Sequence, residues 1–165
     1  MYKGTGASPG IALGKALVIE HSELVIEKKT IENIDEEIQK LESAVKVSKE
    51  ELTKVKEKAL AELGEHEAEI FEAHLLVLED PELIGSAISK IRDEKVNADY
   101  ALNEIKEMFV AMFESMDNEY MRERAADIKD VTNRVLRHIL CIKVVDLAGL
   151  DEEVVLIAHD LTPSD

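Results

Sequence analysis

The chain is poor in residues that stabilise small domains by means other than an aliphatic core. Its 165 residues include no tryptophan, one cysteine and three prolines, and aromatic residues make up 4% of the sequence. A single cysteine excludes an intramolecular disulfide. Cys141 stands between Leu140 and Ile142, which predicts a buried and unreactive thiol. We therefore expect a core built from Leu, Ile, Val, Met and Ala.

Positive charge is also scarce. The 36 acidic residues outnumber the 20 basic ones, which gives a formal net charge of -16. Nucleic acids and anionic membranes are recognised by clustered Lys and Arg, so the charge argues against both as partners. Two explanations of the acidic surface stay open: it attracts a basic protein partner, or it keeps copies of a soluble protein apart.

The sequence has no targeting or membrane segment that we can identify. The N-terminus lacks a basic region followed by an apolar stretch, and no apolar run approaches the length that spans a bilayer. We therefore expect a cytoplasmic protein without a membrane partner.

Common motifs for phosphate, nucleophile and metal chemistry are missing. Neither Gly-x-x-x-x-Gly-Lys nor Gly-x-Ser-x-Gly occurs. The run that starts with His66-Glu67 ends in Ile70, where a zinc protease helix has its second histidine. A di-iron bundle needs Glu three residues before His, but Leu63 precedes His66 and Phe71 precedes His74. We expect no metal site and no cofactor bound by this chain.

What is present is mostly helix signal. Apolar residues recur every three or four positions from Ile31 to Leu63, and Gly64 suits the end of that helix. Further helices are expected over 65–79, from Pro81 to about residue 93, from Asn97, and over 118–140, with Asp80 and Asn97 as N-caps. Long amphipathic helices with short connections predict an antiparallel helical bundle over 21–142.

The two chain ends have a different pattern. Residues 11–19 and 154–158 are strand-like, and a Pro9-Gly10 turn precedes the first of them. This layout predicts an α+β fold, in which the bundle is inserted into an α/β unit formed by residues 1–20 and 143–165. Because the sequence stops soon after the second strand, we expect that unit to be incomplete here.

The helix predicted over 65–79 carries acids at its start and apolar residues on two faces. One face holds Phe71, Leu75 and Leu78. The other holds Leu76, Val77 and, in part, His74. A helix that is apolar on two faces is either fully buried or binds a partner with the second face. Arg124 likewise has two explanations, an intrahelical pair with Asp127 or contact with an anion on a partner.

Four stretches of the sequence resemble, in order, a known family. They are 7–16 (Ala-Ser-Pro-Gly-Ile-Ala-Leu-Gly-Lys-Ala), 71–83 (Phe-Glu-Ala-His-Leu-Leu-Val-Leu-Glu-Asp-Pro-Glu-Leu), 123–128 (Glu-Arg-Ala-Ala-Asp-Ile) and 160–164 (Asp-Leu-Thr-Pro-Ser). Together they resemble the N-terminal part of enzyme I of the bacterial sugar phosphotransferase system, the phosphoenolpyruvate-protein phosphotransferase. The resemblance covers essentially the whole chain.

The resemblance implies a fold and an activity. The chain ends would build a swivelling phosphohistidine α/β domain, and the inserted helices would bind the small carrier HPr. The full enzyme would transfer a phosphoryl group from phosphoenolpyruvate through a histidine to HPr in sugar uptake. Its C-terminal part would bind Mg²⁺ and form a homodimer, so this chain alone is expected to be a monomer.

The resemblance also implies a docking surface for HPr. Carried over position by position, it includes Glu65, Glu67, His74, Leu76, Val77, Glu82, Leu83, Phe113, Met121 and Arg124. The apolar members would form the centre, the acids would meet a basic rim on HPr, and Arg124 would lie near the transferred phosphate. His66 departs from the family, which often has an acid at that position.

The family's acceptor histidine is missing from this chain. It closes a Gly-Gly-x-Thr-Ser-His signature, and the sequence contains no Gly-Gly pair. His159 lies upstream of where the signature would come, and we interpret it as structural. We therefore expect docking without catalysis from this chain. The alternative is a structural helical module that self-associates through the stripe from Ile31 to Leu63 and has no role in phosphotransfer.

Overall fold

The computed structural model describes residues 6, 8–19, 24–142, 153–159 and 161, and within them the chain is mostly helical with one small parallel sheet. The elements are β1 (Lys15–Ile19), α1 (Ile34–Glu62), α2 (Glu65–Glu79), α3 (Pro81–Glu94), α4 (Ala98–Glu114), α5 (Glu119–Ile139) and β2 (Val154–Ala158). They divide into two compact units. The helical unit holds the described residues from 24 to 142, and the strand unit holds those up to residue 19 and from residue 153 onward. The unit boundaries expected near 20 and 143 fall outside the described residues.

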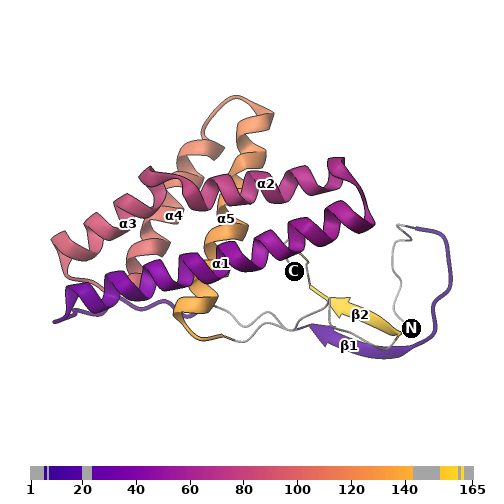
Figure 1. Cartoon of the computed structure of the whole chain (residues 1–165), viewed down its shortest axis with the longest axis horizontal. Helices are drawn as coiled ribbons and strands as arrows, with labels where there is room; N and C mark the ends of the chain where they lie inside the picture. Colours follow the sequence, from indigo (N-terminus) through magenta and orange to yellow (C-terminus); the bar gives the residue numbers. More distant parts are fainter. Residues whose placement is uncertain (1–5, 7, 20–23, 143–152, 160, 162–165) are drawn as a thin grey trace. The chain divides into compact units, whose positions relative to one another are not determined.

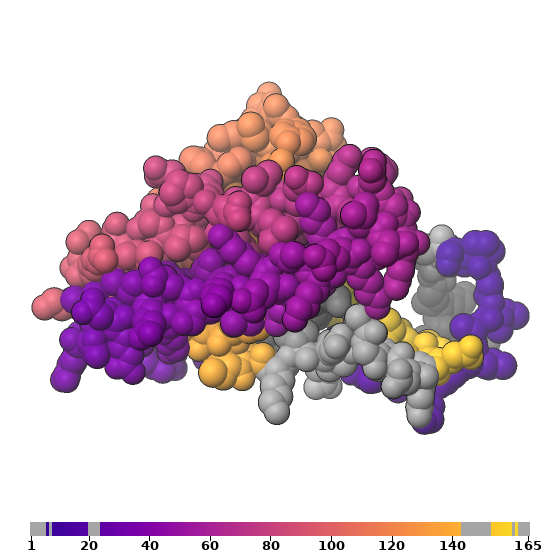
Figure 2. All heavy atoms as spheres, in the orientation of Figure 1, coloured from indigo at the N-terminus to yellow at the C-terminus, as the bar shows by residue number. Residues whose placement is uncertain are grey.

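The helical unit is organised along its longest helix. α1 runs the length of the unit, and α2 and α3 return along it one after the other (Figure 1). α4 and α5 form a second pair that packs against α1, and α5 also packs against α2. In the space-filling view α1, α2 and α3 form one continuous face (Figure 2). The expected bundle is therefore present, with five helices among the described residues.

The core is aliphatic, as the composition predicts. Every helix contributes to one main cluster of buried side chains, whose largest fully buried members include Leu41, Leu52, Leu83, Ile91, Leu102 and Leu136. The regular stripe lies in or against this cluster from Ile31 to Ala59, because α2, α3, α4 and α5 all pack on α1, whereas Leu63 at its end is exposed. The surface that the self-association alternative needs is thus used within the chain.

Local chemistry sets most helix ends where the sequence predicts them. Asp80 Oδ1 accepts a hydrogen bond from the Glu82 backbone N–H at 2.8 Å, so it caps α3 as expected. Gly64 ends α1 with a φ of +117°, a conformation that favours glycine, and its N–H donates to the Ala59 carbonyl. α1 begins later than expected, at Ile34, because Asn33 caps it.

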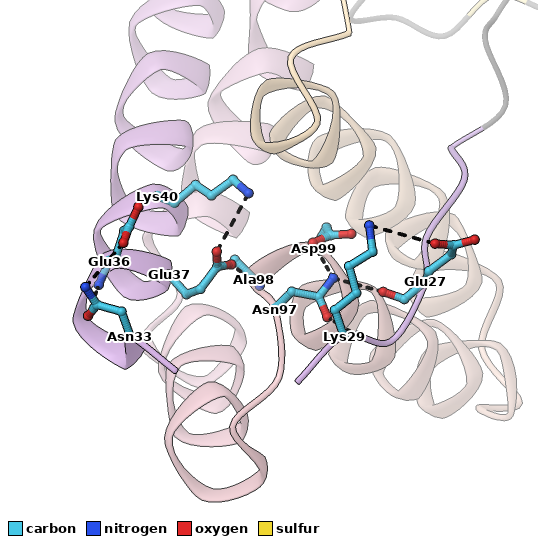
Figure 3. A network of polar contacts seen from close by, with 9 residues as sticks. All are labelled: Glu27, Lys29, Asn33, Glu36, Glu37, Lys40, Asn97, Ala98 and Asp99. Atoms are coloured by element: carbon cyan, nitrogen blue, oxygen red, sulfur yellow. Dashed lines mark hydrogen bonds and ion pairs between the residues drawn. The ribbon is translucent and has the colours of Figure 1, made fainter. Parts of the chain in front are cut away.

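Asn97 is the N-cap residue of α4, but its side chain makes no capping hydrogen bond to that helix. Its Oδ1 accepts from the Lys29 backbone N–H at 2.7 Å, and its Nδ2 donates to the Glu27 carbonyl at 2.9 Å (Figure 3). Glu37 of α1 caps the first turn of α4 instead, because its carboxylate accepts a hydrogen bond from the Ala98 N–H at 2.7 Å. Asn97 therefore ties the segment before α1 to the start of α4.

Cys141 corrects one expectation. The thiol is exposed, and the residue has a positive φ of +54° directly after α5. The apolar run around it predicts burial only if α5 continues, but α5 ends at Ile139. The change of backbone direction at the helix end turns the side chain outward.

The strand unit pairs the two ends of the chain. β1 and β2 are parallel, with Lys15 opposite Val154 and Ile19 opposite Ala158. The second strand matches its predicted range, whereas the first begins at Lys15 instead of residue 11. None of the described residues of this unit is buried. A Cβ at Gly14 would lie 3.2 Å from the Glu153 carbonyl oxygen, so glycine allows the two chain segments to approach closely.

Candidate functional site

The predicted docking residues come from four helices, and three of these, α2, α4 and α5, meet at a second, smaller hydrophobic cluster. Val110, Ala125 and Ile128 are its buried members, contributed by α4 and α5. Val77 of α2 and Phe113 of α4 both pack against it. The cluster thus brings residues that lie far apart in the sequence onto one part of the helical unit.

The apolar centre of the predicted surface is only partly exposed. Leu76 is 59% exposed, although its helix α2 packs against α1, α3 and α5. Val77, Phe113 and Met121 are half-buried. Leu83 is 1% exposed and belongs to the main core, so it offers no side-chain surface to a partner. Its expected place in the apolar centre does not agree with this burial, because its side chain packs in the main core.

His74 is also placed beneath the surface. It is 0% exposed, on the side of α2 that packs against α5. Its Nε2 lies 3.3 Å from Asp127 Oδ1, and the edge of its ring meets Phe71 at a centroid distance of 6.0 Å. His74 connects α2 to α5, and it cannot touch a partner while it is buried in this way.

Arg124 makes the intrahelical pair that its sequence position predicted, and it remains partly exposed. Its Nη1 lies 4.0 Å from Asp127 Oδ2, which is the intrahelical pair. Its Nη2 donates to the Tyr120 hydroxyl at 2.9 Å, and the guanidinium carbon lies 5.4 Å from the centre of the Tyr120 ring. The side chain is 30% exposed. The guanidinium is therefore held by neighbours and still accessible.

Tyr120 is the residue that the sequence analysis missed. It is 57% exposed and precedes Arg124 by one helical turn. The spacing of four residues between Tyr and Arg was the available signal, because side chains at that spacing lie side by side on a helix. Tyr120 thus joins the candidate surface beside Met121 and Arg124.

The acids of the candidate surface differ from their neighbours on α2. Glu65, Glu67 and Glu82 are exposed in the first turns of α2 and α3, and within the described residues their carboxylates make no ion pair. Glu72 and Glu79 of α2, by contrast, pair with Lys56 and Lys49 of α1 at 3.3 and 3.7 Å. An acid in the first turn also stabilises its helix through the helix dipole. The three exposed carboxylates remain free for a cationic partner.

His66 lies between Glu65 and Glu67 in the first turn of α2, and its nearby acid belongs to the same helix. Its side chain is exposed, and its Nδ1 lies 3.7 Å from Glu69 on the same helix. Within the part of the chain that the structure describes, no group of three or more His, Cys, Asp or Glu is placed to hold a metal ion. No described helix is long and apolar enough to cross a membrane.

The fold defines a helical unit inserted between two strands that pair in parallel. Residues 3–124 match the family model described as PEP-utilising enzyme, N-terminal. The chain therefore belongs to the family of PEP-utilising enzymes and carries its N-terminal part.

Curated relatives agree with this assignment. The chain is 56% identical over 163 residues to a phosphoenolpyruvate-protein phosphotransferase of Priestia megaterium, covering 99% of this chain and 28% of that protein. The enzyme of the same name from Bacillus subtilis (strain 168) is 54% identical, with 99% and 29% covered. The chain thus spans less than a third of the length of these relatives.

Solved structures show the same fold. A solution NMR structure of an enzyme I protein superposes with a TM-score of 0.91 at 48% identity, covering 100% of this chain and 67% of that one. The N-terminal domain of a nitrogen enzyme I matches with a TM-score of 0.74 at 21% identity, covering 96% of this chain and 65% of that one, which shows the fold alone. The resemblance noted in the sequence is confirmed at the level of the family.

Proposed function

We propose that this chain supplies the docking surface for the phosphocarrier protein HPr in a phosphoenolpyruvate-dependent phosphotransfer system. The observation that carries the proposal is an exposed Leu76 on α2 next to Val77, which packs with Phe113 on one cluster, together with first-turn acids of α2 and α3 that make no ion pair among the described residues. An apolar centre with a charged margin is the usual anatomy of a protein interface. We choose HPr as the partner because the chain belongs to the family of PEP-utilising enzymes and resembles enzyme I.

We further propose that the phosphoryl transfer needs residues beyond these 165. No histidine here follows a Gly-Gly-x-Thr-Ser sequence, so the acceptor histidine belongs to another part of the protein. The strand unit would contribute to the swivelling phosphohistidine domain. Mg²⁺ binding and homodimer formation would likewise belong to other parts, and this chain alone would be a monomer in the cytoplasm.

Charge gives the proposed complex its speed and its salt dependence. The free carboxylates of Glu65, Glu67 and Glu82 would attract a basic rim on the partner, which accelerates encounter and is screened by salt. The apolar centre would then resist dissociation. The accessible guanidinium of Arg124 would face an anion on the partner.

An NMR titration of the isotope-labelled chain with HPr tests the proposal. We expect amide shifts to cluster on residues 65–83 and 113–127. Leu76→Ala should weaken binding about tenfold, as expected for an apolar interface anchor. Leu60→Ala is the matched control, since Leu60 is also an exposed leucine on a helix but lies outside the surface. Absence of shifts at high HPr concentration would contradict docking by this chain.

The charge contribution can be tested separately. The triple variant Glu65→Gln, Glu67→Gln, Glu82→Gln should slow association and flatten its dependence on salt. Glu57→Gln, at an exposed position of α1, is the control for loss of an acid elsewhere. An unchanged salt dependence in the triple variant would show that the three acids do not contribute to the interface. The apolar centre would still be tested by Leu76→Ala.

A further inference from the structure

The buried histidine and the accessible arginine share one carboxylate. Asp127 directs Oδ1 toward His74 Nε2 at 3.3 Å and Oδ2 toward Arg124 Nη1 at 4.0 Å. His74 belongs to α2, whereas Asp127 and Arg124 belong to α5. A group on the surface is therefore linked through one side chain to a group in the interior.

The surroundings of His74 select one form of its ring. Its Nδ1 is buried and has no hydrogen-bond partner among the described residues. A protonated Nδ1 would bury an N–H without an acceptor, which is costlier than burying an unused lone pair. Of the two neutral tautomers, the one with its proton on Nε2 therefore fits the site, and in that tautomer Nε2 donates to Asp127.

Arg124 is held from two sides. Tyr120 accepts from Nη2 at 2.9 Å, and Asp127 faces Nη1 from the inner side. Arginine carries large rotamer freedom, and fixing it before binding lowers the entropy lost on association. His74 fixes the position of Asp127 because a fully buried ring has no freedom to move away.

We propose that Asp127 is a positioning residue of the docking surface, which orients Arg124 toward an anionic group of the partner while buried His74 holds it in place. The proposal rests on the docking function proposed above and adds the reason why Arg124 is presented in one orientation. The Asp127 side chain faces both the buried His74 and the partly exposed Arg124, and in this proposal it acts on the partner through the guanidinium.

Removal of the Asp127 charge changes binding in opposite directions if Asp127 positions Arg124 and if it competes with the partner's anion. A carboxylate beside Arg124 could also compete with the partner's anion, and then its removal would strengthen binding. If Asp127 positions Arg124, Asp127→Asn weakens binding instead. Asn keeps an Oδ1 that can accept from His74 Nε2, so we expect the fold to be retained, whereas the charged Oδ2 that faces Arg124 is replaced by an uncharged NH₂ donor.

A double-mutant cycle tests the proposal by titration with HPr. We expect Asp127→Asn to weaken binding about fivefold in the wild-type background and to have no further effect in the Arg124→Ala background. Asp93→Asn removes the same charge from an exposed position on α3 and should bind like wild type. A purely structural role would weaken binding equally in both backgrounds, and tighter binding of Asp127→Asn would indicate competition; either result overturns the proposal.

A measurement on the free chain distinguishes failure of this inference from failure of the docking function. Side-chain ¹⁵N NMR should show His74 protonated on Nε2 alone and should show faster rotation of the Arg124 guanidinium in Asp127→Asn. Wild-type chain that does not bind HPr would overturn the proposed function and this role with it. Wild-type binding combined with unchanged Arg124 mobility in Asp127→Asn would overturn the positioning role alone.

Discussion

The helical unit and the strand unit are both rich in aliphatic residues, yet among the residues that the structure describes only the helical unit has a core. Leu41, Leu52 and Leu136 are fully buried in the helical unit, while none of the described residues of the strand unit is buried. β2 is a run of five apolar residues, more hydrophobic than any stretch of α1 of that length. The comparison shows that an apolar sequence becomes a core only where a second apolar surface covers it.

The largest expected difference between the units is in amide hydrogen exchange. Two paired strands without a covered face are marginally stable, whereas helices packed on a core open only with the whole unit. We expect amides of α1 and α5 to exchange about a thousandfold more slowly than those of β1 and β2, which corresponds to about 4 kcal/mol. Mass spectrometry or NMR of the exchange would measure this. Equal protection in both units would show that the strand unit is covered in solution.

A pair of equivalent truncations sharpens the comparison. Leu41→Ala removes a side chain that is 0% exposed and should lower the free energy of unfolding of the helical unit by about 3 kcal/mol. Leu156→Ala in β2 removes a side chain that is 41% exposed and should leave that free energy within about 0.5 kcal/mol. Urea unfolding followed by helical circular dichroism measures both. A comparable loss in Leu156→Ala would mean that the two units unfold together.

The sequence predicts helix ends well where the chemistry is local. Asp80 and Asn118 accept hydrogen bonds from N–H groups two residues ahead, so nothing distant in the sequence affects them. Asn97 looks the same in the sequence, but its partners lie at residues 27–29, which only the folded chain brings near. Cys141 was misjudged for a related reason, because burial beyond a helix end depends on where the backbone turns.

The burial of the residues predicted for the candidate surface could not be read from the sequence. The spacing of apolar residues shows that α2 has two apolar faces, but it does not show how far the neighbouring helices cover the second one. α5 covers His74 completely and leaves Leu76 exposed, although the two are only two residues apart. Leu83 is covered because α3 packs against α1, α2 and α4. Burial at such positions is decided by the packing of helices, which no single segment encodes.

Asn97 gives the next prediction, of intermediate size. Asn97→Ala should lower the free energy of unfolding by about 2 kcal/mol, because it leaves the Lys29 N–H and the buried Asp99 carboxylate without their Asn97 partner. Asn118→Ala is the matched comparison: it removes a true cap at an exposed helix end and should cost about 1 kcal/mol. Urea unfolding measures both. Equal losses of unfolding free energy in the two variants would mean that Asn97 contributes no more than an ordinary cap, and that its bonds to residues 27–29 add little stability.

The smallest effect concerns a surface cluster at the end of α3, where Glu94 meets Lys90 at 2.7 Å and Lys28 at 3.2 Å. Side-chain hydrogen bonds from Lys90 and Lys28 lower the pKa of Glu94, and the bond to Glu94 raises the pKa of Lys90. A carboxylate with a lowered pKa in the folded state stabilises the fold above its unfolded pKa, and that contribution is lost as the pH falls through the folded value. The Lys90 contribution is lost at the alkaline end, as the pH rises through the raised pKa of Lys90.

Glu94→Gln should therefore be slightly less stable than wild type at neutral pH. The difference should disappear in acid, and it should shrink in high salt because the cluster is exposed. Unfolding curves of both proteins at several pH values measure it, and a difference that persists at acid pH would show that Glu94 stabilises α3 by packing and not by charge.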